Sequence, residues 1–244
     1  MKPPNTSPRQ GRTIAAGLVL GALVALPQAA VAQSTFHHAG NARLLTSDEA
    51  AVIKHPVLGL QRSALPLGLG FAVDTSVLAD AALTPNLGLR WSLEAGPHRF
   101  VVGARYAKFM GGELVSNFIT SQQPAIKSFN SDFSGPSFYA VYGVTLGPVL
   151  LQAEARHYRY ETANTSVTGA VVFNFAGNWA VVGEFGTWLQ PGNPLHGAAG
   201  IRYAGDNFGF SLGAAYVGLN EPLIPYNGGS IPVLPAFDLS WTFQ

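Results

Sequence analysis

The chain has 244 residues, enough for one domain or at most two, and only 11% are charged, against roughly 25% in an average soluble domain. Its formal net charge of +1 excludes a basic nucleic-acid binder, and the absence of cysteine excludes disulfides and thiolate chemistry. Hydrophobic residues make up 48%, yet no uninterrupted apolar run after the N-terminus reaches the ~18–20 residues of a membrane helix. This composition predicts an all-β membrane barrel.

Residues 1–32 have the pattern of a cleaved secretory signal peptide. Basic residues precede an apolar run at 14–26, and Ala30 and Ala32 stand at the −3 and −1 positions of a cleavage site before Gln33. Cleavage there would leave 11 basic and 13 acidic residues, a formal net charge of −2. The exported chain is therefore expected to be mildly acidic.

Residues 33–64 are more polar than the rest and predict an N-terminal periplasmic segment, or one that tucks into the barrel mouth. Thr46-Ser47-Asp48-Glu49 has the form of a capping box, so a short helix could follow over 50–55 and stop before Pro56. The adjacent pair His37-His38 is not expected to bind a metal, because neighbouring residues near a mobile terminus seldom share one ion.

From Leu65 to the C-terminus the apolar residues recur with period two, as half-buried strands require. In the stretch 87–94, for example, leucine and tryptophan alternate with glycine, arginine, serine and glutamate. The pattern predicts a transmembrane up-and-down antiparallel β-barrel over 65–244, with the apolar face toward lipid. About ten strands are expected, at 65–75, 84–95, 98–109, 136–146, 149–160, 165–176, 178–189, 194–204, 207–217 and 232–243.

The connections between these strands alternate in length. Tight turns centred on Gly96, Gly147, Gly177 and Gly205 alternate with longer, more polar connections. This alternation is typical of a membrane barrel with short periplasmic turns and longer extracellular loops. It predicts an even number of strands and both chain ends on the short-turn side.

The last strand carries a further pattern. Phe237, Leu239, Trp241 and Phe243 occupy alternate positions, and Gln244 follows. This resembles the C-terminal assembly signal of bacterial outer-membrane β-barrel proteins, in which an aromatic residue is commonly the last one. The resemblance implies an outer-membrane location, contact with outer-membrane lipid, and recognition by the barrel assembly machinery.

The predicted strands place charged residues on the lumen side, because an Arg or Lys facing lipid at mid-bilayer would cost about 2–4 kcal/mol. We expect these side chains to form a salt-bridge network that largely closes the lumen; the alternative is a narrow polar conduit. The predicted lumen charge network consists of Asp74, Arg90, Glu94, Arg105, Glu154, Arg156, Glu184, Arg202 and Asp238.

Aromatic residues near strand ends, among them Tyr158 and Trp188, are expected to form the girdles at the headgroup level. A hydrolase needs a nucleophile, a base and an orienting group within reach. No such set is visible around His157 or His196, and the rim Asp-Asp and Asp-His pairs of the omptin proteases have no counterpart. We therefore predict no catalytic residue, and no metal or cofactor site.

The sequence favours a non-enzymatic outer-membrane barrel with a structural or surface-binding role. The long polar connection 110–135 is a candidate for binding an extracellular ligand, and no nucleic-acid partner is expected. A narrow channel for small solutes and a rim enzyme remain as alternatives. A soluble secreted barrel is disfavoured, because its outside would carry more charge than about one residue per strand.

Overall fold

The computed structural model describes residues 43–111, 134–159, 163–191, 194–216, 225–226, 229–230 and 233–244. The predicted signal peptide and nearly all of the candidate binding loop 110–135 lie outside these ranges. Within the described ranges, no helix is both long and apolar enough to cross a membrane.

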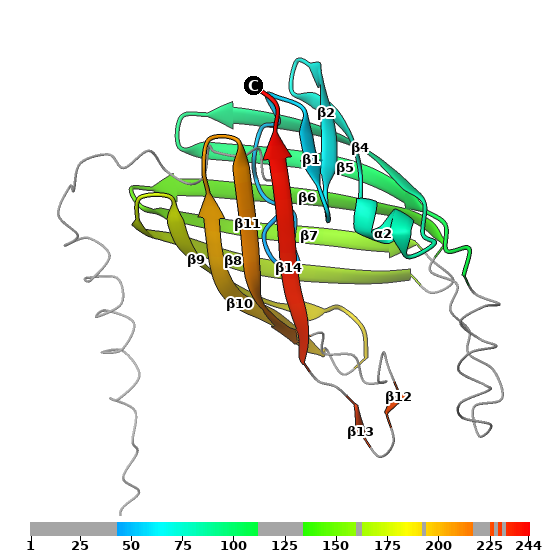
Figure 1. The fold of residues 1–244 in the computed structure, drawn as a ribbon. Helices are drawn as coiled ribbons and strands as arrows, with labels where there is room; N and C mark the ends of the chain where they lie inside the picture. The colour runs from blue at the N-terminus through cyan, green and yellow to red at the C-terminus, as the bar shows by residue number, and fades with distance from the viewer. Residues whose placement is uncertain are drawn as a thin grey trace, which may run out of the picture. The chain divides into compact units, whose positions relative to one another are not determined.

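Twelve antiparallel strands of the described chain form a closed barrel, in which each strand pairs with its neighbours in sequence and β1 closes the ring against β14 (Figure 1). The short helix α2 (Val77–Ala81) lies between β3 and β4, and β12 (Pro225–Tyr226) and β13 (Gly229–Ser230) form a separate two-stranded sheet. The barrel strands are β1 (Val57–Gly59), β2 (Ser63–Gly68), β3 (Phe71–Thr75), β4 (Asn86–Ala95), β5 (His98–Ala107), β6 (Gly135–Leu146), β7 (Val149–Arg159), β8 (Ala163–Ala176), β9 (Trp179–Trp188), β10 (Leu195–Ala204), β11 (Phe208–Tyr216) and β14 (Val233–Thr242).

The outer face of the barrel is apolar and the inner face is buried. On β4, Leu87 and Leu89 are 65% and 49% exposed, whereas the intervening Gly88 and the following Arg90 are buried. The residues predicted as an assembly signal, Phe237, Leu239, Trp241 and Phe243, are likewise exposed on the outside. The predicted all-β antiparallel barrel with an apolar outer face is confirmed.

The strand count exceeds the predicted ten. The run expected over 65–75 is two strands, because the chain reverses at Leu69 and Gly70, which both have positive φ. Leu67, Leu69 and Phe71 continue the apolar alternation through this turn, so the periodicity concealed it. The boundary predicted at residue 65 is also too late, since Val57–Gly59 already pairs with Thr242–Ser240 of β14.

The wall has two distinct ends. Gly96, Gly147 and Gly177 occupy the tight turns at one end, each with a φ of 53–61°. The C-terminus and the short strands β1 and β2 lie at this turn end (Figure 1). The other end, here called the loop end, is where β7 and β9 finish and β8 and β10 begin.

The predicted helix over 50–55 is not present, because these residues have no helical conformation. Instead, residues 43–56 run in an extended and turning path within the barrel, visible in blue behind β14 in Figure 1. A helix does not form here because backbone groups of this segment are bonded to side chains of the wall.

Candidate functional site: the occluded lumen

Residues 43–56, here called the plug, fill the interior of the barrel. Leu44 and Leu45 are buried in an apolar cluster with inner-face residues of the wall that include Leu150, Val172 and Val182. Deeper along the plug, Ala50 and Ile53 join two further buried clusters on the inner faces of β5–β6 and β1–β3. The plug therefore packs against the wall as a protein core does, by burying apolar side chains.

The tip of the plug is a tight turn that encloses the carboxylate of Glu184 from β9. The Leu44 N–H donates to the Ser47 carbonyl (3.0 Å), which closes the turn. The N–H groups of Leu45 (2.8 Å) and Thr46 (2.9 Å) then donate to Glu184, as do the hydroxyls of Thr46 and Ser47. Successive N–H groups of a turn form a concavity that suits an anion, so the turn stabilises the buried carboxylate of Glu184.

Side chains of β7 bind the next stretch of plug backbone. The Asp48 N–H donates to Glu154 (2.5 Å), and the Ala50 N–H donates to Oε1 of Gln152 (3.1 Å). The Gln152 amide donates in turn to the Asp48 carbonyl (2.7 Å). A helix over 50–55 would use the carbonyls of Asp48, Glu49 and Ala51 for its own backbone bonds. These carbonyls instead accept from Gln152 and Arg90, which explains why the capping-box pattern does not produce a helix.

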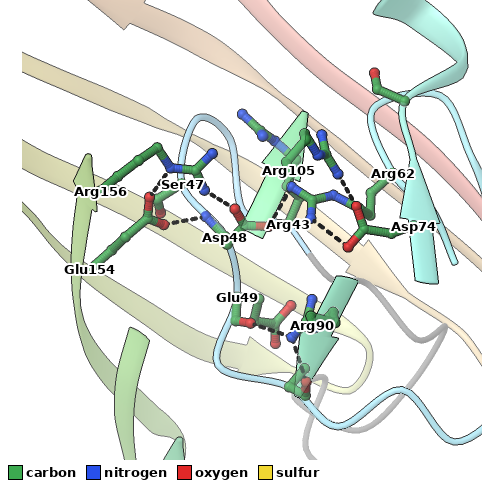
Figure 2. Close-up of polar contacts among 12 residues, drawn as sticks. Arg43, Ser47, Asp48, Glu49, Arg62, Asp74, Arg90, Arg105, Glu154 and Arg156 are labelled. Carbon is green, nitrogen blue, oxygen red and sulfur yellow. Dashed lines mark hydrogen bonds and ion pairs between the residues drawn. The ribbon is translucent and has the colours of Figure 1, made fainter. Parts of the chain in front are cut away.

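Asp48 lies between two arginines that approach from different parts of the wall. Its carboxylate is paired with Arg62 from the β1–β2 connection (2.5 Å) and with Arg156 of β7. Figure 2 shows Asp48 between these two guanidinium groups. All three side chains are almost fully buried, so water does little to screen their interaction.

Glu49 and its carbonyl connect the plug to β10 and β4. Arg202 donates to the Glu49 carboxylate (2.8 Å), and Arg90 donates to the carbonyls of Glu49 (3.2 Å) and Ala51 (2.7 Å). The two adjacent acidic residues, Asp48 and Glu49, thus bind arginines on several sides of the barrel, and they tie the wall together across the lumen.

Burial shapes the ionisation of the plug itself. It raises the pKa of Glu49, while the nearby Arg202 acts in the opposite direction. It lowers the pKa of Arg43 to about 10, an effect reinforced by the positive charges of Arg62 and Arg156. Arg43 donates to the Thr46 carbonyl (2.6 Å), so its contact is with the plug turn.

The structure places the nine predicted lumen residues on the inner side but joins few of them directly. Asp74 pairs with Arg105, and Glu154 pairs with Arg156 (2.7 Å). The other five have partners outside the predicted set: Arg90, Glu184 and Arg202 bind the plug, Glu94 lies 3.7 Å from Lys54 and Arg99, and Asp238 accepts from the N–H of Gln61 (2.9 Å).

Sequence reasoning missed Asp48, Glu49, Arg62, Arg99 and Gln152 as lumen residues. Arg99 and Gln152 share the inward parity of Val101 and Glu154, so the alternation alone could have identified them. Asp48 and Glu49 precede the period-two region, and no pattern in the sequence marks them as lying inside the barrel.

Two aromatic residues assigned to the girdle lie elsewhere. Tyr158 and Trp188 follow the inward parity of Arg156 and Glu184 and line a cavity inside the loop end. His196 is beside them, with Nε2 3.5 Å from the Thr168 hydroxyl, so a hydroxyl does lie near this histidine. His157 is outside the lumen, and its Nδ1 lies 2.9 Å from the Thr165 hydroxyl.

No protein-family model matches the sequence, and no curated protein matches it either. Among solved structures, a similar chain is a loop-deletion mutant of OmpT, an outer membrane protein of Vibrio cholerae, with 11% identity and a TM-score of 0.38. The similarity covers 73% of this chain and 60% of that chain, so this chain spans less than two thirds of that protein. With its closed antiparallel wall and apolar outer face, this chain resembles outer-membrane β-barrel proteins.

Proposed function

We propose that this protein is a non-enzymatic outer-membrane barrel whose lumen is kept closed by its own N-terminal plug, and which serves a structural or surface-binding role. The observation that carries the proposal is the placement of Asp48 and Glu49 inside the barrel, where they pair with Arg62, Arg156 and Arg202. An open conduit would need this space for water and solutes, and here protein side chains occupy it.

The absence of catalysis is part of the proposal. Nucleophilic catalysis needs a hydroxyl activated by a base that a third group orients. His196 and Thr168 are 3.5 Å apart, beyond good hydrogen-bond distance, and the His157–Thr165 contact lies outside the lumen. Neither contact is supported by a carboxylate bonded to the imidazole among the described residues.

Single-channel recording in planar lipid bilayers tests the closure. Residues 33–244, refolded, are compared with the double variant Asp48→Asn/Glu49→Gln, which removes both plug charges at nearly constant shape. We expect the wild-type protein to be silent and the double variant to show openings. Glu94→Gln is the matched control, because Glu94 is a partly exposed lumen carboxylate, and this variant should stay silent.

Steady wild-type channels with the same conductance as the double variant would contradict the proposal and favour the narrow-channel alternative. Folding of each variant is checked by its heat-modifiable mobility on gels, so that a silent but unfolded sample is not counted as a closed barrel.

A further inference from the structure

A cavity of about 160 Å³ lies inside the loop end of the barrel, above the tip of the plug. Thr46 and Ser47 of the plug form one side of it, and residues of β7 to β11 form the rest. Tyr158, Trp188 and His196 in its lining are partly exposed, so the cavity is accessible from the loop end. The ion pairs that close the lumen leave this cavity unfilled.

One side of the cavity is aromatic. The ring centroids of Tyr158 and Trp188 are 5.7 Å apart and those of Trp188 and His196 are 5.6 Å apart, with the rings tilted by 37° and 48°, so the three rings are in contact and Trp188 lies between the other two. Tyr158 and Trp188 point into the barrel, as the alternation along β7 and β9 requires, so they are not part of the lipid-facing girdle. An aromatic surface of this kind offers an apolar platform to a flat ligand, with polar groups at its edges.

The other side of the cavity is lined by small hydroxyls. Ser166 and Thr168 of β8 are both 95% buried, with 5% of each residue exposed. A hydroxyl can both donate and accept a hydrogen bond, and the Thr168 hydroxyl lies 3.5 Å from Nε2 of His196. Both hydroxyls line the cavity beside the aromatic surface, where they can bond to a ligand.

The charge of the lining favours a neutral ligand. Glu154 is the acidic residue in the lining, and its two carboxylate oxygens already accept from Arg156 and from the Asp48 N–H. A cationic ligand would have to compete with that arginine. The hydroxyls of Ser166 and Thr168 and the imidazole of His196 also line the cavity, and these groups suit ligand hydroxyls.

The size of the cavity is close to that of the roughly 150 Å³ engineered cavity that encloses benzene, so a sugar ring, which has about twice as many heavy atoms, would be held in part and would extend toward the loop end. Benzene itself suits a dry apolar cavity, whereas this lining combines rings with hydroxyls. We propose that the cavity binds one neutral sugar ring, with its flat C–H face on Trp188 and its hydroxyls toward Ser166 and Thr168. The ring would come from a free monosaccharide or from the end of a glycan.

Saturation-transfer NMR with methyl glycosides of neutral hexoses tests this inference on residues 33–244 folded in a detergent that has no sugar headgroup. We expect saturable binding of at least one glycoside with a dissociation constant on the order of 1 mM, as a ligand of this size allows. Trp188→Ala should weaken binding at least about tenfold. Trp179→Ala is the matched control, because that ring contacts Tyr203 and Phe210 at the turn end, and it should leave binding unchanged.

Ser166→Val is a second variant that removes the hydroxyl at little cost in volume and should also weaken binding. The inference is overturned if no glycoside binds the folded wild-type protein, or if Trp188→Ala and Trp179→Ala have equal effects. A glycan that ends in the bound hexose and binds tenfold more tightly than its methyl glycoside would identify a glycan terminus as the source; equal affinities would identify the free sugar. Because the readout is binding, failure here is distinct from failure of the conductance test.

Discussion

Replacing Asp48 with asparagine should release the plug without unfolding the wall. Asp48 is fully buried and pairs with both Arg62 and Arg156. Breaking a buried ion pair costs about 3–5 kcal/mol. The lower end applies here, because Arg62 keeps Asp74 at 3.1 Å and Arg156 keeps Glu154 at 2.7 Å. We therefore expect the substitution to destabilise the docked state of the plug by about 3 kcal/mol. This would raise the population of released plug by a factor of roughly 100.

The chain contains no cysteine, so a single introduced thiol can report on the plug. Ala51→Cys places this thiol at a small plug residue that is 8% exposed. Its labelling rate by a soluble maleimide is proportional to the released population when the plug opens and closes faster than the thiol reacts. Asp48→Asn should raise that rate by about 100-fold relative to Ala51→Cys alone.

Glu94→Gln is the control for loss of a lumen charge. The Glu94 side chain is 29% exposed, and its partners lie 3.7 Å away, so its pairs should contribute at most about 1 kcal/mol, or roughly fivefold in labelling rate. If Asp48→Asn accelerates labelling no more than Glu94→Gln does, the buried pairs do not hold the plug and the reasoning fails. Heat-modifiable mobility shows whether the wall has stayed folded.

Two further predictions concern packing on the two faces of the wall. A Cβ at Gly143 would lie 2.8 Å from Cβ of Ala50, so Gly143→Val should destabilise the docked plug by roughly 1–3 kcal/mol, measured by the same thiol labelling. Gly183 lies on the outer face with open space around it, so Gly183→Val should leave the labelling rate unchanged. Leu89→Arg puts a charge on the outer face within β4 and should lower the free energy of unfolding by about 2–4 kcal/mol, measured by reversible urea unfolding in lipid. Leu146→Arg, at a strand end, should lower it by only about 0–1 kcal/mol. Equal losses would argue against a lipid-facing surface.

The sequence was sufficient to predict most of the wall, because a strand between lipid and lumen must alternate. This constraint made β4 to β11 and β14 visible within a few residues of their observed bounds. It failed at Leu69, where an exposed leucine in a turn happened to continue the alternation. It also failed at β1, which has three residues and is too short to carry a period.

Of the contacts in the lumen, only the residues contributed by the wall were predictable. The charged residues of the wall could be assigned inward from their parity, but their partners could not, because the plug has no regular period. Leu45 and Glu184 are in contact although 139 residues separate them in sequence. Tyr158 and Trp188 differ from the general preference of such rings for the headgroup level, because they follow the inward parity of their strands and lie in the lumen.

The closure of the barrel between β1 and β14 has a consequence for the order of folding. The plug leads directly into β1, and the ring closes through three residue pairs, Val57–Gly59 with Thr242–Ser240. A barrel that closed before the plug had entered would leave Arg156 and Arg202 inside without Asp48 and Glu49. Closure of the wall and docking of the plug are therefore energetically linked, because the arginines of the closed wall are paired with plug carboxylates.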